Sequence, residues 1–482
     1  MKNVKRTRSI TMLLGLVMLL GVMLGACVNT SDIPELFENS HFEENSSEYI
    51  NESEEELSTP EGCTDAPVVA GVVNIKPTTV AVYGTCEENA VICATGGKKD
   101  AETNAHGGYF IIEVEIWDRN TLLKVTAQVE GEEESLEREV VAKKNATADT
   151  LLDGNSVSVG LNSRLYFDKM VEDLSGTNLY TESELNKIRE YVTDTVTSYY
   201  NDRAGGQDVE LIYVLVPNVT TVDNTIVPEE VIGATNSTIY QQIADTLSRT
   251  RATVVDLKPV FEALMQDEEA MSKYGGIYRE TDSALTDYGA YIAYRELMNV
   301  IAATFPAAAP RTEEEFEWKS VEVKGGNLVG YRELDGDVIT EEIIAAVPTF
   351  ELGYGNNAAG SSKISSLQKY VDAANGDYNY FTTFDNADGI NGIAERWLVD
   401  ATAREDAADL PSAIIYRDYS SLSFTDILAE RFSKVMLGKM NDLNINLSTA
   451  PQYANDGDAV VDYIIVIVSE ENMDNAFGLA LS

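Results

Sequence analysis

Histidine is almost absent from this chain. Among 482 residues there are only two, His41 and His106. Histidine is the side chain whose ordinary pKa best suits a general base near neutral pH. Because no histidine follows position 106, the last three-quarters of the chain cannot supply one. This excludes a histidine-dependent hydrolytic mechanism carried by that part alone.

Basic residues are also scarce. The chain has 35 Lys and Arg against 80 Asp and Glu, which gives a formal net charge of −45. A surface this acidic repels phosphates, so nucleic acid is excluded as a partner. The length predicts two or three domains, and 44% hydrophobic residues suffice for sizeable cores.

The N-terminus has the pattern of an export signal. Residues 1–26 contain basic residues and no acid, and an apolar run from Met12 to Leu24 precedes Gly25-Ala26-Cys27. The run is shorter than the roughly 20 residues that a membrane span prefers. Small residues directly before Cys27 resemble a bacterial lipobox. That resemblance implies lipidation at Cys27 and attachment to the extracytoplasmic face of the cell membrane.

Residues 27–65 are predicted to be a disordered tether. From Asp32 to Glu56 the stretch holds ten acids and no Lys or Arg. Like charges repel one another and extend such a segment. We expect it to hold the folded part away from the membrane.

Residues 66–147 show short apolar or alternating runs separated by turn residues, which predicts an all-β sandwich. The rhythm resembles the immunoglobulin-like modules of bacterial surface proteins. His106 lies in a Gly-rich turn, where we expect an exposed side chain. Cys63, Cys86 and Cys93 allow one disulfide and leave one thiol, and the pairing stays open. Their spacing does not favour zinc.

Residues 158–482 are predicted to form an α/β domain with a doubly wound parallel sheet. Apolar runs alternate with helical patterns near 235–249, 287–303 and 424–436. The predicted strands are Val209–Val216, Thr253–Leu257, Ala413–Tyr416 and Tyr463–Val468. Ligands of such sheets bind at the carboxyl ends of strands. The polar residues at or just beyond the ends of the four strands are Asn218, Asp256, Asp418 and Glu470.

The segment 311–400 is predicted to be a β and loop insertion. Trp318–Val323 and Asn327–Leu334 have the pattern of paired strands, and Tyr354–Asp388 that of a lid or binding loop. Asp385–Gly389 lacks the spacing of a calcium loop. We predict no metal and no cofactor.

Six short segments occur in the order known from one family. They are Ser163–Phe167, Val216–Asn218, Val254–Leu257, Tyr278–Ala290, Ile415–Ser420 and Ile467–Glu470. Together they resemble the SGNH hydrolase-like domains of the AlgX/AlgJ and DHHW type. The resemblance implies a flavodoxin-like α/β fold. It also implies O-acetyltransferase or esterase activity on extracytoplasmic polysaccharide, with a serine nucleophile and an Asp–His pair.

The chain departs from that pattern at the catalytic positions. Asp282 is retained, but Ser283-Ala284-Leu285 stand where the family has its histidine. Tyr419 stands at the nucleophile position, with Ser420 one step later. A serine hydroxyl needs a base within hydrogen-bond reach. We therefore predict a degenerate site in which Asp282 and Ser420 are remnants. The cleft candidates are Asn218, Asp256, Tyr278, Arg417, Asp418 and Tyr419.

Each candidate also has a structural interpretation. Asp282 could order the start of the following helix, Ser420 could cap a helix, and Arg417 with Asp418 could form an internal ion pair. The tyrosines at 274, 278, 288, 291 and 294 suit either sugar stacking or a core.

Three functions remain open from the sequence. The first is a lipid-anchored pseudoenzyme that binds cell-envelope polysaccharide or a partner enzyme and assists glycan modification. The second is an active O-acetyltransferase or acetylesterase built on Asp282 and Ser420. The third is a solute-binding lipoprotein.

Overall fold

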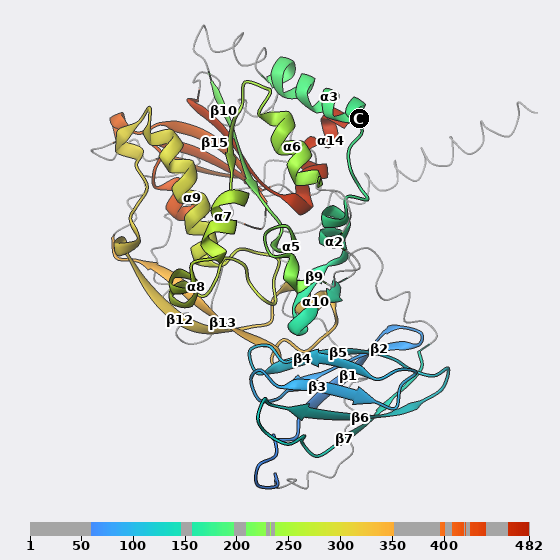
Figure 1. Ribbon diagram of the computed structural model, residues 1–482. Coiled ribbons are helices and arrows are strands. Elements are labelled where there is room, and N and C mark those ends of the chain that lie inside the picture. Colours follow the sequence, from blue (N-terminus) through green and yellow to red (C-terminus); the bar gives the residue numbers. More distant parts are fainter. Residues whose placement is uncertain are drawn as a thin grey trace, which may run out of the picture. The chain divides into compact units, whose positions relative to one another are not determined.

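The structure is a computed structural model (Figure 1). It describes residues 59–145, 157–196, 209–227, 232, 237–350, 396–400, 407–418, 420, 425–439 and 461–481. The predicted signal peptide, Cys27, most of the tether and the predicted loop Tyr354–Asp388 lie outside the described residues. The described residues all fall within one unit, Asn51–Ser482.

The first part of the described chain is all-β, with two antiparallel sheets. One sheet has the order β1-β2-β5, from Val68–Lys76, Thr79–Thr85 and Tyr109–Glu115. The other has the order β4-β3-β6-β7, from Ala101–Asn104, Val91–Thr95, Thr121–Gln128 and Arg138–Ala142. Alternate residues of a strand face opposite sides, and the inward ones of both sheets share one core. That core includes Val82 and Phe110 from one sheet and Ile92 and Leu123 from the other, all fully buried.

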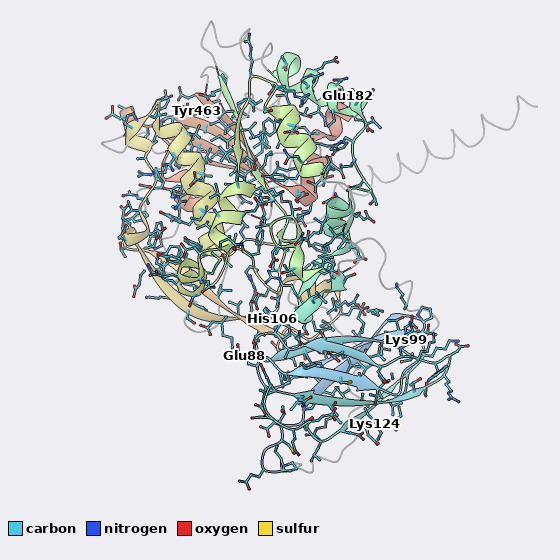
Figure 2. The ribbon with its side chains drawn as sticks, in the orientation of Figure 1. Glu88, Lys99, His106, Lys124, Glu182 and Tyr463 are labelled. Carbon is cyan, nitrogen blue, oxygen red and sulfur yellow. The ribbon has the colours of Figure 1, made fainter. Side chains whose placement is uncertain are left out.

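The three cysteines form no disulfide in the described structure, and His106 has an acidic partner. Cys63, Cys86 and Cys93 are all free thiols in the described structure, so no disulfide forms among them. Burial raises the pKa of Cys86 to about 12. His106, labelled in Figure 2, is not a freely exposed turn residue, because its Nε2 lies 2.8 Å from a carboxylate oxygen of Glu280 in the α/β part. The glycines beside His106 create the turn as predicted, but an acidic partner from a distant loop meets the ring there.

The α/β part is built on a six-stranded sheet of order β11-β10-β17-β15-β16-β14. All neighbouring pairs are parallel except β14 with β16. The strands are Thr253–Asp256, Glu210–Val216, Tyr463–Ser469, Ser412–Arg417, Lys434–Lys439 and Arg396–Asp400. The four apolar runs predicted as strands are confirmed as β10, β11, β15 and β17.

Helices cover both faces of this sheet, because its central strands are apolar on both sides (Figure 1). On one face Ile212, Val214 and Ile465 join a core with α7 (Lys258–Met265) and α9 (Asp287–Ala302). On the other face the alternate residues Tyr213, Leu215 and Val466 join a second core. The helices of that second face are α3 (Glu182–Glu190), α6 (Ile239–Leu247) and α14 (Met473–Leu481).

Two helices begin at threonine caps. Thr181 and Glu184 form the capping box of α3. The Thr286 hydroxyl accepts a hydrogen bond of 3.1 Å from Gly289 N at the start of α9. The remaining helices and strands are α2 (Asp168–Ser175), α5 (Val219–Val222), α8 (Glu268–Tyr274), α10 (Asn327–Tyr331), α12 (Thr425–Ala429), β8 (Val157–Val159), β9 (Leu165–Phe167), β12 (Phe316–Lys324) and β13 (Thr340–Pro348).

Two predicted elements are wrong. The helix expected over 424–436 stops at Ala429, and the chain continues as β16, whose Val435 is fully buried beside β15. The strand expected over Asn327–Leu334 is the short helix α10, and β12 pairs instead with β13. Gly325 and Gly326 interrupt the extended chain there, and the backbone amide of Asn327 bonds to a buried carboxylate rather than to a strand.

In the described parts of the chain, no helix combines the length and apolarity that a membrane crossing requires.

Candidate functional site

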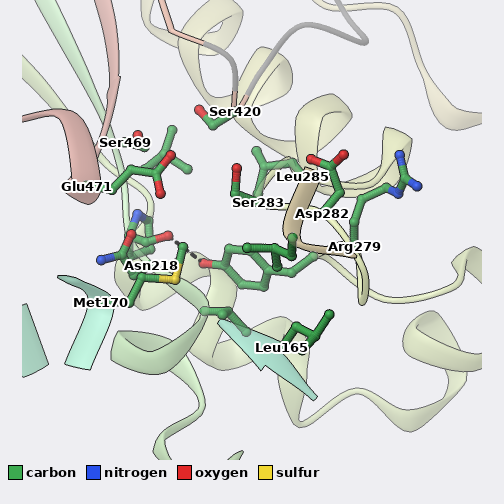
Figure 3. Close-up of a pocket in the computed structure, with 15 residues that line it drawn as sticks. Leu165, Met170, Asn218, Arg279, Asp282, Ser283, Leu285, Ser420, Ser469 and Glu471 are labelled. Carbon is green, nitrogen blue, oxygen red and sulfur yellow. Dashed lines mark hydrogen bonds between the residues drawn. The ribbon is translucent and has the colours of Figure 1, made fainter. Parts of the chain in front are cut away.

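The α/β part contains a pocket at the carboxyl ends of β10, β15 and β17 (Figure 3). The space within it and at its open mouth amounts to about 400 Å³, a volume that includes solvent. Fifteen residues line it: Leu165, Met170, Val216, Pro217, Asn218, Val219, Tyr278, Arg279, Asp282, Ser283, Leu285, Leu328, Ser420, Ser469 and Glu471. This is the edge of a parallel sheet at which ligands are expected.

Asn218 joins the ends of β10 and β17. Its backbone amide donates to Glu470 Oε2 at 2.9 Å, and its side-chain amide donates to Asp173 Oδ2 on α2 at 3.1 Å. Burial raises the pKa of Glu470 to about 7 and that of Asp173 to about 6, since water is removed from both carboxyls. Both carboxyls therefore take up a proton at a higher pH than an exposed carboxyl does.

Asp418 joins the ends of β15 and β17 in the same way. Its Oδ1 accepts from the backbone amide and the hydroxyl of Ser420, at 3.0 and 2.5 Å. Its Oδ2 accepts from the backbone amide and the hydroxyl of Ser469, both at 2.6 Å. Asp418 is 1% exposed. The Ser420 hydroxyl therefore points to a structural carboxylate, whereas an activated serine would donate to an imidazole.

Asp282 orders the loop that faces these strand ends. Its Oδ1 accepts from Ala284 N at 3.0 Å, and its Oδ2 accepts from Asn327 N at 3.1 Å. Gly326 packs so closely on this carboxylate that an added Cβ would lie 2.3 Å from Oδ2. Asp282 thus connects its own loop to the first turn of α10.

A buried ion pair holds the same loop from the other side. The guanidinium of Arg279 contacts the carboxylate of Glu341 on β13, and the two side chains are 2% and 1% exposed. Glu341 Oε2 also accepts from the backbone amides of Glu280 and Thr281, at 2.7 and 3.1 Å. Tyr278 completes the attachment, since its hydroxyl donates to Pro217 O at 2.8 Å.

Glu471 lines the pocket two residues after the end of β17. It is partly buried, and Figure 3 shows its carboxylate directed into the pocket. Burial raises the pKa of Glu471 to about 8, and the negative charges of Asp418 and Asp282 add to the effect, while Lys169 opposes it. The site is therefore crowded with negative charge.

The predicted candidates divide into three groups. Lining the pocket are Asn218, Tyr278, Asp282 and Ser420. Arg417 and Asp418 are 2% and 1% exposed and do not line it. Tyr419 lies outside the described residues.

Asp256 is not part of the pocket. Its Oδ1 accepts from the Tyr240 hydroxyl at 2.6 Å and from Lys258 N at 3.0 Å, at the start of α7. Strand β11 lies at the edge of the sheet, so its carboxyl end falls outside the pocket.

Most of the predicted tyrosine cluster is core. Tyr274, Tyr288, Tyr291 and Tyr294 are each 3% exposed or less, and three of them contact Trp318. Of that cluster, only Tyr278 lines the pocket of the described structure.

Sequence reasoning missed Glu471, Ser469 and the pair of Arg279 with Glu341. Glu471 and Ser469 flank Glu470, which was the residue predicted at the end of this strand. The strand-end rule therefore identified the correct turn but named only one of its three residues. Arg279 and Glu341 are 62 residues apart. No local pattern marks either as buried.

The arrangement offers hydroxyls, carboxyls and an aromatic ring. In the described part of the pocket wall there is no imidazole. Among the described residues, no group of three or more His, Cys, Asp or Glu side chains has an arrangement that could hold a metal ion. Such a wall suits the recognition of a polyhydroxylated ligand.

Comparison with known families supports the predicted family resemblance. Residues 193–343 match the family model described as SGNH hydrolase-like domain, acetyltransferase AlgX. The chain therefore carries an SGNH hydrolase-like domain of the AlgX type, as the sequence predicted. The match includes Asp282 and its loop and ends before β15.

Several solved structures are similar at low identity. PatB1 of Bacillus cereus is 14% identical, with 66% of this chain and 97% of its own covered and a TM-score of 0.45. A DHHW family protein from Eubacterium siraeum is 14% identical, with 74% and 93% covered and a TM-score of 0.40. The O-acetyltransferase domain of Pseudomonas putida AlgJ is 12% identical, with 66% and 92% covered and a TM-score of 0.39. No curated protein matches the chain.

Proposed function

We propose that this protein is anchored by a lipid at Cys27 on the extracytoplasmic face of a bacterial membrane. Its SGNH hydrolase-like domain binds cell-envelope polysaccharide and assists O-acetylation of that glycan without performing serine–histidine acyl transfer itself. The two-sheet β part serves as an immunoglobulin-like spacer. The export pattern of residues 1–26 and the family match over 193–343 support this function.

The observation that carries the non-catalytic role is how the two remnant catalytic residues are used. The Asp282 carboxylate accepts from two backbone amides, one of them that of Ala284. Ala284 belongs to the segment in which the family has its histidine. The Ser420 hydroxyl donates to Asp418. Each group stabilises a loop, and neither is connected to an imidazole in the described structure.

The test compares binding with turnover in one preparation. The purified protein is mixed with soluble envelope polysaccharides, and separately with p-nitrophenyl acetate. We expect retention of a polysaccharide and ester hydrolysis no faster than that of the Ser420→Ala variant. Hydrolysis that disappears in Ser420→Ala would overturn the non-catalytic role. Replacing Cys27 with alanine should release the protein from membranes.

A second candidate, an active esterase, has one observation in its favour. The Ser420 hydroxyl and the Glu471 carboxyl line the same pocket, and a carboxyl with a pKa near 8 can accept a proton at slightly alkaline pH. A serine-reactive fluorophosphonate decides between the candidates, since only the esterase would be labelled at Ser420. The solute-binding function is disfavoured, because the pocket lies at the edge of one described sheet rather than between two lobes.

A further inference from the structure

The pocket wall has an unbalanced charge. Of the fifteen residues that line it in the described structure, Asp282 and Glu471 are acidic and only Arg279 is basic. The Arg279 guanidinium is buried against Glu341, and Figure 3 shows it directed away from Glu471. The pocket therefore presents carboxylates without a free cation from its described wall.

Glu471 differs from the other acids of the site in its hydrogen bonding. Asp282, Asp418 and Glu470 each accept at least one backbone amide. The Glu471 carboxylate has no hydrogen-bond donor among the described residues. The nearest lysine, Lys169, donates to the Glu471 backbone carbonyl at 2.6 Å and lies 3.1 Å from Asp474. Its ammonium is thus engaged outside the pocket.

Neighbouring carboxylates disfavour a negative charge on Glu471. Burial is the largest cause of the raised pKa of Glu471; among the neighbouring charges Asp418, Asp282 and Asp173 raise this pKa further, while Lys169 lowers it. A carboxyl that repels neighbouring carboxylates gains most when a cation enters, because the cation relieves the repulsion and supplies the missing donors.

The remaining wall has the chemistry of a sugar site. Tyr278, Leu165 and Leu328 offer ring and methyl surface, while Ser283 offers a hydroxyl to the same space. An aromatic ring beside hydroxyl groups suits the alternating apolar and polar faces of a pyranose. A ligand that complements both the carboxyls and the aromatic and hydroxyl groups of this wall is a sugar ring that carries a positive charge.

We propose that this pocket binds an amino sugar with a free ammonium group, as found in an N-deacetylated glycan, and that Glu471 is the residue that pairs with the ammonium. This inference rests on the proposed glycan-binding function and names the ligand class. An N-acetylated sugar carries a neutral amide at the same place, and so it leaves the Glu471 carboxylate without a counter-charge.

The experiment is calorimetric titration of the whole protein with two probes, a tetramer of β-1,4-linked glucosamine and the matching tetramer of N-acetylglucosamine. We expect the glucosamine tetramer to bind at least tenfold more tightly and to weaken as salt is added. In Glu471→Gln the preference should fall below twofold, and in Glu471→Asp part of it should return. Glu322→Gln, an exposed change on β12, serves as the matched control and should leave it intact.

The outcomes separate this inference from the function on which it rests. Equal or tighter binding of the acetylated tetramer would overturn the amino-sugar assignment while leaving glycan binding in place. So would an unchanged preference in Glu471→Gln. If envelope polysaccharide binds but neither tetramer does, the assignment is again wrong. Failure of every glycan to bind would remove the proposed function as well.

Discussion

Glu470 gives the sharpest prediction about stability. This residue is 1% exposed, and its Oε2 accepts from Asn218 N. We predict that Glu470→Gln stabilises the protein at pH 8 far more than at pH 5. The amide keeps an oxygen for Asn218 N but cannot ionise.

The magnitude follows from the pKa of Glu470. Burial raises it from the ordinary value of 4.5 to about 7. A folded-state pKa above the unfolded one means that the stability from this group is fully present below about pH 4.5 and is lost as pH rises through about 7. The cost of ionising Glu470 is then roughly 3 kcal/mol at pH 8 and about 1 kcal/mol at pH 5. The charge of Asp173 is one of the causes of this raised pKa, after burial.

The assay is thermal unfolding of wild type and variant at both pH values. Any fixed cost of exchanging a carboxyl for an amide cancels when the two pH values are compared. The remaining difference of about 2 kcal/mol corresponds to roughly 3 °C in Tm, because a domain of this size has an unfolding entropy of about 0.7 kcal/mol/K. Glu322→Gln controls for the loss of one exposed carboxyl. A stability difference that is the same at pH 5 and pH 8 would refute the reasoning.

Two further predictions concern the loop that carries Asp282. Glu341→Gln leaves the buried guanidinium of Arg279 without its counter-charge and should cost about 3–5 kcal/mol, measured as a lower midpoint in urea; a loss below 1 kcal/mol would contradict the buried pair. Gly326→Ala places a methyl group against the Asp282 carboxylate and should cost about 1–3 kcal/mol in the same measurement. Gly330→Ala on the same short helix meets nothing within 4 Å and is the matched control; equal effects of the two changes would argue against the contact.

The sheet was largely predictable and the insertion was not, for a physical reason. β10 and β17 are continuous apolar runs because helices cover both faces of the sheet, and such runs are visible in sequence. β16 has fewer consecutive apolar residues and follows directly after a helical pattern. Its sequence alone therefore does not indicate a strand, and the segment becomes one because it pairs with β15. For α10 the deciding contact is with Asp282, which is 45 residues earlier in the chain.

The candidate site shows the same division between local and distant causes. The strand-end rule located Asn218 and Asp418 because connectivity alone brings those ends together. Glu341 and Glu342 are adjacent glutamates on β13, and only the alternation of the strand sends one of them to Arg279. The sequence Glu341-Glu342 by itself does not show which of the two side chains is buried.

The position of β17 has a consequence for how the protein folds. This strand is the last of the described sheet in the chain, yet it lies between β10 and β15 and pairs with both, Glu210 with Tyr463 and Ala413 with Tyr463. Until residues 463–469 are available, the sheet exists only as two halves that have no edge in common. Contacts between such distant residues form slowly. The pocket lies across these three strands, so it is completed only when the final strand enters the sheet, and a ligand can bind only after that step.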